Sequence, residues 1–86
     1  NNVIIKFTTK TANTSTVLTI KNSANDTVYT ETISGGLAVG GHYFYLNKFD
    51  TSVSSGRLTT AMVAGQTYSY TITEGAATIA SGYFTA

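Results

Sequence analysis

The sequence predicts an all-β fold, a single antiparallel β-sandwich of about seven strands with an Ig-like or prealbumin-like architecture. The chain contains 17 Thr and 6 Tyr, which are residue types that favour strands. Apolar and polar residues alternate along several short segments. Turn-forming residues separate these segments at intervals of about 8–12 residues. No segment has the period of a helix. Because 86 residues provide one small core, residues 1–86 are predicted to form a single domain.

The first predicted strand covers residues 3–9, where apolar residues recur at every second position and share one face. The segment is apolar and contains no Pro, so we expect an edge strand that can pair with a neighbouring copy of the chain. The candidate contact residues of this strand are Val3, Ile4, Ile5 and Phe7. The alternative, which is more frequent in β-domains, is that the strand pairs within its own domain.

Residues 16–22 and 28–33 form a predicted hairpin, because both segments alternate and turn-forming residues 23–26 join them. Gly residues at 35–36 and 40–41 then interrupt the pattern.

Residues 42–49 contain four large aromatic rings and are predicted to form the next strand. Alternation places Phe44 and Leu46 in the core and leaves Tyr43 and Tyr45 on the outer face. Exposed rings can stack on the faces of sugars, so Tyr43 and Tyr45 are candidate contacts for a carbohydrate. The chain contains no Trp, and the alternative is that these rings cover a neighbouring strand or an interface.

Three further strands complete the prediction, at residues 57–63, 67–73 and 76–85. Gly82 is expected to mark a bulge or a bend in the last of them. The residues predicted to form the core are Phe7, Leu18, Ile20, Phe44, Leu46, Leu58, Tyr68, Tyr70, Ile72 and Phe84.

Several stretches resemble known β-domains: residues 15–23 (Ser-Thr-Val-Leu-Thr-Ile-Lys-Asn-Ser), 28–30, 55–60, 63–72 (Val-Ala-Gly-Gln-Thr-Tyr-Ser-Tyr-Thr-Ile) and 81–85. They resemble strands of prealbumin-like domains, a group that includes the collagen-adhesin B-type repeats and the carboxypeptidase-regulatory-like domains. The Ala-Gly-Gln-Thr-Tyr part is also similar to the strand before the tyrosine corner of fibronectin type III domains. The resemblance implies a non-catalytic extracellular module that serves as a spacer, stalk, adhesin or enzyme appendage.

Some adhesin repeats carry a Lys–Asn crosslink that a buried acid assists, and Lys6 lies where such a Lys would be. Residues 76–85 contain no Asn or Asp, and residues 57–63 contain no acid. We therefore expect no crosslink here, and we expect Lys6 to be a solvated residue on an edge strand.

Charge and composition exclude several functions. The net charge is +1 and the basic residues are scattered, so the basic stripe that nucleic-acid binding requires is missing. The chain lacks Cys, and no apolar run approaches the length of a transmembrane segment. Its Thr-rich, charge-poor composition is typical of secreted and cell-surface β-domains.

Catalysis is not expected. His42 is the single His, and its only partners nearby in the sequence are Asp50 with Ser52 or Ser54. The Gly-x-Ser-x-Gly motif of a nucleophile elbow does not occur, and the acids are too few and dispersed for a glycosidase pair. We predict that the protein is not an enzyme and needs no cofactor or metal.

The sequence thus favours an extracellular structural or attachment module, such as a filament subunit, stalk or adhesin-type repeat, whose partners are neighbouring copies or domains of the same protein. The alternative is a carbohydrate-binding or spacer module attached to a secreted polysaccharide-degrading enzyme, with polysaccharide as its partner.

Overall fold

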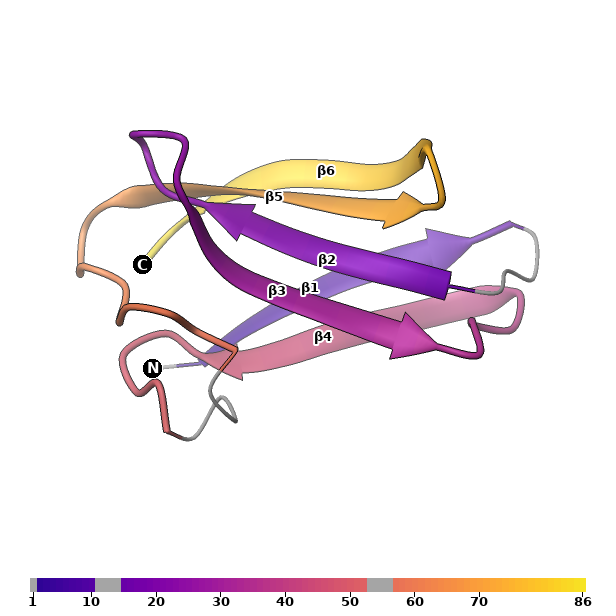
Figure 1. Ribbon diagram of the computed structural model, residues 1–86, viewed down its shortest axis with the longest axis horizontal. Coiled ribbons are helices and arrows are strands. Elements are labelled where there is room, and N and C mark those ends of the chain that lie inside the picture. Colours follow the sequence, from indigo (N-terminus) through magenta and orange to yellow (C-terminus); the bar gives the residue numbers. More distant parts are fainter. Residues whose placement is uncertain (1, 11–14, 53–56) are drawn as a thin grey trace.

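The computed structural model describes residues 2–10, 15–52 and 57–86, which form strands and connecting segments but no helix. The strands are β1 (Asn2–Thr9), β2 (Ser15–Lys21), β3 (Thr27–Ser34), β4 (Gly40–Asn47), β5 (Thr67–Glu74) and β6 (Ala77–Thr85). They form two antiparallel sheets, one of two strands in the order β1-β4 and one of four strands in the order β3-β2-β5-β6 (Figure 1). The all-β prediction is confirmed.

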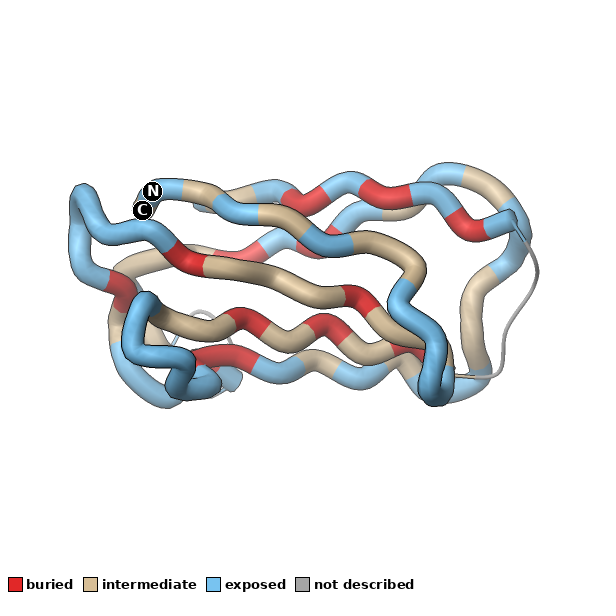
Figure 2. Tube along the Cα trace, turned by 90° about the horizontal axis from the view of Figure 1, so that it is seen from above, coloured by how far each residue is buried: buried red, intermediate tan, exposed pale blue. Residues whose placement is uncertain are grey.

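The two sheets pack over one apolar core, as in a β-sandwich. Figure 2 shows buried residues recurring at alternate positions along the strands, which is the expected pattern for sheets with one inner face. All the predicted core residues are buried except Tyr70 and Phe84, which are partly buried and pack against the core. The buried apolar residues are Ile5, Phe7, Leu18, Ile20, Val28, Tyr29, Phe44, Leu46, Leu58, Met62, Tyr68 and Ile72.

The predicted hairpin is present as β2 and β3. In the turn that joins these two strands, the Asn22 side chain accepts hydrogen bonds from the backbone N–H groups of Ala24 and Asp26, at 3.0 and 2.9 Å. The register then shifts between Ile20 and Lys21, which leaves Val28 without a partner residue on β2. This bulge is why two consecutive side chains of β3, Val28 and Tyr29, are both buried.

The strand predicted at residues 57–63 is not formed. Leu58 makes a single bridge to Tyr29, and the Met62 N–H then donates to the backbone oxygen of Lys48, 2.8 Å away. The segment thus crosses from the edge of β3 to the end of β4 instead of pairing along either strand. Leu58 and Met62 are both buried, so the apolar spacing reflects two anchors on the core and not a pleated strand.

The bulge expected at Gly82 lies elsewhere. The register of β5 and β6 shifts between Ile72 and Thr73, and Ile79 is the residue without a partner. Gly82 instead lies opposite Tyr70, and a Cβ at position 82 would be 2.8 Å from Cε2 of that ring. The ring fills the space above the glycine, so a close approach and not a bend explains why Gly occurs here.

Hydroxyl side chains line the outer face of the four-stranded sheet. The registers align Thr30, Thr19, Thr71 and Ser81 in one row across all four strands. Thr19 lies between the buried residues of β2, so this row faces away from the core. Thr thereby supplies the polar surface that charged residues supply in most domains.

None of the described segments is a helix of the length and apolarity that a membrane crossing requires.

Candidate binding surface on the two-stranded sheet

The outer face of the two-stranded sheet carries the candidate ligand contacts. Ile4 pairs with Tyr45 and Lys6 pairs with Tyr43 across β1 and β4. Their sequence neighbours on both strands are buried or partly buried, so these four side chains share the face that points away from the core. We call Ile4, Lys6, Tyr43 and Tyr45 the tyrosine face.

Three large side chains of the tyrosine face are more than half exposed. The exposed fractions are 67% for Tyr43, 55% for Tyr45 and 52% for Ile4. Alternation in the sequence predicts that both tyrosines lie on the outer face, and the structure places them there. Tyr43 and Tyr45 are two residues apart on one strand, so the two rings lie side by side along β4.

A shallow hollow of ≈ 390 Å³ adjoins Tyr43. Gly41 lies opposite Thr8 in the register, and a Cβ at Gly41 would have no neighbour within 4 Å. The missing side chain leaves this space open, and Lys6 and Thr8 supply polar groups beside it. The hollow is lined by Lys6, Phe7, Thr8, Gly41, His42 and Tyr43.

His42 serves the local structure. Its Nε2 lies 2.7 Å from the backbone oxygen of Ala38, and its ring lies 5.7 Å from that of Phe7. His42 is the third residue of β4 and Asp50 follows the end of that strand, so the part of β4 from His42 to Asn47, about 17 Å over five residues, lies between them. The Ser52 hydroxyl donates to Asp50 Oδ1 at 2.6 Å, and Ser54 lies outside the described residues.

No three His, Asp or Glu side chains of residues 2–10, 15–52 and 57–86 gather where they could hold a metal ion. Lys6 is exposed on the outer face of β1, as expected for a solvated edge residue.

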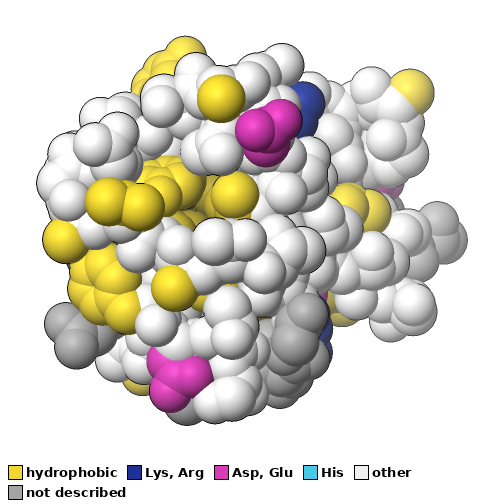
Figure 3. Space-filling model, turned by 60° about the vertical axis from the view of Figure 1, so that its left-hand side comes forward, with side chains coloured by type: hydrophobic (Ala, Val, Ile, Leu, Met, Phe, Trp, Pro, Cys, Tyr) yellow, Lys and Arg dark blue, Asp and Glu magenta, His cyan; other side chains and the backbone are white. Residues whose placement is uncertain are grey.

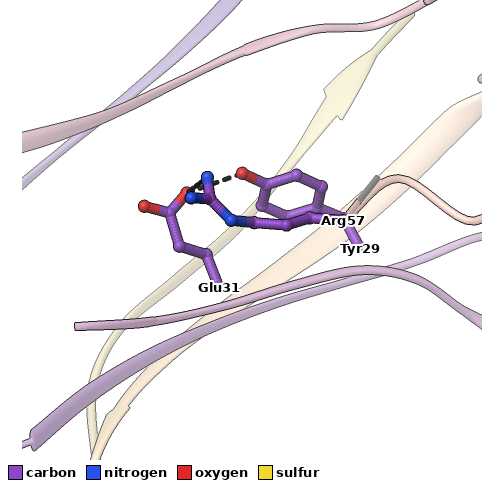
Figure 4. A network of polar contacts seen from close by, with 3 residues as sticks. All are labelled: Tyr29, Glu31 and Arg57. Carbon is purple, nitrogen blue, oxygen red and sulfur yellow. Dashed lines mark hydrogen bonds and ion pairs between the residues drawn. The ribbon is translucent and has the colours of Figure 1, made fainter. Parts of the chain in front are cut away.

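A polar cluster at the edge of the core was not anticipated from the sequence (Figure 4). The hydroxyl of Tyr29 donates to Glu31 Oε1 at 2.6 Å, and a guanidinium nitrogen of Arg57 lies 3.3 Å from the same oxygen. Burial, and then the hydrogen bond to Glu31, raise the pKa of Tyr29 above its ordinary value. The alternating pattern of Tyr29, Glu31 and Ile33 is the sequence signal that could have revealed an inward-facing acid.

The candidate edge strand is β1, which pairs along its whole length with β4 of the same chain. Val3, Ile5 and Phe7 face inward, whereas Ile4 faces outward. Among the described residues, no strand pairs with the opposite edge of β1. One edge of β1 is therefore paired within the domain, and its other edge has no strand partner among the described residues.

Comparison with known protein families, with curated proteins and with solved structures gives no match to this chain. The fold agrees with the prealbumin-like and fibronectin-like resemblance only in being all-β with two antiparallel sheets.

Proposed function

We propose that this domain is a non-catalytic structural or attachment module of a secreted or cell-surface protein, and that it binds neighbouring copies or domains through strand edges and an outer sheet face. The prealbumin-like or Ig-like family relationship is part of this proposal. Its basis is the resemblance of the strand sequences together with the two-sheet architecture.

The observation that supports the proposal most is the tyrosine face. Ile4, Tyr43 and Tyr45 expose apolar surface side by side, and Lys6 is the one charged residue among them. An apolar patch of this kind commonly marks a contact surface. Tyr is also favoured at interfaces, because it combines a large apolar ring with a hydroxyl that can remain hydrated.

Light scattering over a concentration series tests this proposal. The chain is expected to self-associate, and the double variant Tyr43→Ser/Tyr45→Ser is expected to remain monomeric at concentrations where the wild type associates. Tyr83→Ser is the matched control, because Tyr83 is 79% exposed but lies on β6 of the other sheet. A wild-type chain that stays monomeric at millimolar concentration would contradict the proposal.

A second candidate function is carbohydrate binding, which the hollow beside Tyr43 favours. Two adjacent rings offer a stacking platform, and Lys6 and Thr8 place polar groups at its rim. Titration with soluble glucan, xylan and chitin oligomers should shift the ring signals of Tyr43 and Tyr45, and those of Tyr83 should stay unchanged. Flat titrations across all three glycans, with the tyrosine signals well resolved, would remove this candidate.

A further inference from the structure

The two long sides of the sandwich are closed differently. Along the side formed by β3 and β4, the segment at residues 57–62 fills the space between the sheets. Leu58 and Met62 of this segment are 2% and 4% exposed, and its backbone bonds to both Val28 and Lys48. This side therefore has a covering segment that completes the core.

No described segment covers the opposite side, which is formed by β1 and β6. Both strands are edges of their sheets, and among the described strands they are the one pair from different sheets whose backbones approach each other, although only at a few residues. Tyr68 and Ile72 on the inner side of β5 are buried, whereas four other apolar residues of β5 and β6 that pack against the core stay partly exposed. These residues are Tyr70, Ile79, Ala80 and Phe84. We call them, together with the open edge of β1, the open seam.

The arrangement of the strands explains why the open seam stays uncovered. β1 runs diagonally behind the four-stranded sheet, and its Thr9 end approaches the β5–β6 turn (Figure 1). There a hollow of ≈ 210 Å³ separates Thr8, Thr9 and Lys10 from Glu74 and Ile79. Towards the other end, where both termini lie, hydrophobic side chains gather at the surface (Figure 3).

We propose that the open seam accepts an extended strand of another polypeptide, which pairs with β1 and covers the apolar residues of β6. This inference rests on the proposed attachment function and identifies the site and the partner's chemistry. The edge of β1 presents backbone donors and acceptors, and a β-strand is the group that matches them at the ladder spacing. Apolar side chains at every second position of that strand would point inward, towards Tyr70 and Phe84.

Charge defines the partner further. Lys6 is exposed near the middle of β1, on the outward side. A residue directly opposite Lys6 on an added strand would have its Cβ roughly 5 Å away, where an acid is favourable and a second Lys is not. Two copies of β1 that pair antiparallel about their centres would bring Lys6 close to the partner's Lys6. The expected partner is therefore a different segment, with alternating apolar residues and an acid on its outward side.

A capped synthetic peptide with the sequence Thr-Val-Thr-Val-Glu-Val-Thr-Val-Thr tests the inference. Its binding is measured by fluorescence anisotropy, and its site is mapped by backbone amide shifts of the full chain. The peptide should shift amides of β1 and β6. Lys6→Glu should weaken binding of this peptide about fivefold. A peptide with Lys in place of its Glu should bind the Lys6→Glu variant more tightly than the wild type. Lys21→Glu is the control, because Lys21 lies on β2 of the four-stranded sheet.

Several outcomes would overturn the inference: no binding, shifts confined to β3 or to Tyr43 and Tyr45 of β4, or equal affinity of wild type and Lys6→Glu. Lys6 is exposed, so this variant should fold, and circular dichroism checks that it does. Light scattering separates this inference from the proposed function. If the wild type self-associates through Tyr43 and Tyr45 but does not bind the peptide, the inference alone fails.

Discussion

Glu31 points inward from an edge strand, next to a core that would penalise an unpaired carboxylate. Tyr29 donates a hydrogen bond to this acid from the core side, and Arg57 approaches it from the solvent side. Because Arg57 directly precedes the buried Leu58, the cluster also holds the covering segment against β3. A polar network thus fixes the position of an apolar anchor.

Tyr29→Phe is expected to lower the free energy of unfolding by about 1.5–3 kcal/mol at neutral pH, because the variant removes a hydrogen bond to a charged group. Urea denaturation measures this loss. The pKa of Tyr29 is raised in the folded state from its ordinary value of 10.0, so the stabilisation is complete below about pH 10 and is lost as the pH rises further.

The difference in stability between wild type and Tyr29→Phe should therefore shrink above pH 10 or so, roughly where an unperturbed Tyr titrates. The other tyrosines titrate in both proteins and cancel in this comparison. A difference that stays constant from pH 7 to about pH 11 would contradict the role assigned to the Tyr29 hydroxyl.

Gly82 and Gly41 differ in the space that is free for a side chain. A Cβ at Gly82 would collide with the ring of Tyr70, whereas one at Gly41 would meet no atom within 4 Å. Gly82→Ala is expected to cost about 1–3 kcal/mol and to displace the Tyr70 ring, and Gly41→Ala should leave stability nearly unchanged. Thermal unfolding and the ring signals of Tyr70 provide the readout. Equal stability of the two variants would show that the ring does not lie over Gly82.

At the scale of the elements, the sequence predicts strands well wherever alternation coincides with pairing. The β2–β3 hairpin is predictable because turn formers separate two alternating segments. The strand predicted at residues 57–63 is wrong because the spacing of Leu58 and Met62, four positions apart, is compatible both with a strand and with two separate anchors on the core. Alternation also places Tyr43 and Tyr45 outward. It cannot reveal the hollow or the open seam, because both depend on which strands become neighbours.

The covering segment at residues 57–62 provides a prediction at this scale. Met62→Ala should lower the free energy of unfolding by about 2–5 kcal/mol, because it leaves a cavity under the segment. Val63→Ala is the adjacent control, since Val63 is 59% exposed and its truncation should cost little. Denaturant unfolding of both variants measures the difference. Losses of similar size would mean that this segment does not close the core.

At the scale of the whole molecule, polar surface is supplied mainly by hydroxyl groups. The net charge is +1 and charged residues make up 10% of the chain, so little electrostatic repulsion opposes association. The outer face of the four-stranded sheet is rich in Thr and Ser and carries the exposed ring of Tyr83, whereas the outer face of the two-stranded sheet carries the adjacent exposed rings of Tyr43 and Tyr45. The two outer faces therefore differ in chemistry, and association is expected through the second.

A map of backbone amide shifts against protein concentration tests the central claim, attachment through the tyrosine face, most directly. We expect signals of Ile4, Tyr43 and Tyr45 to move together as concentration rises, while those of Thr19, Thr30 and Thr71 on the opposite face stay fixed. Spectra that do not change up to millimolar concentration, or shifts centred on the Thr-rich face, would contradict the account.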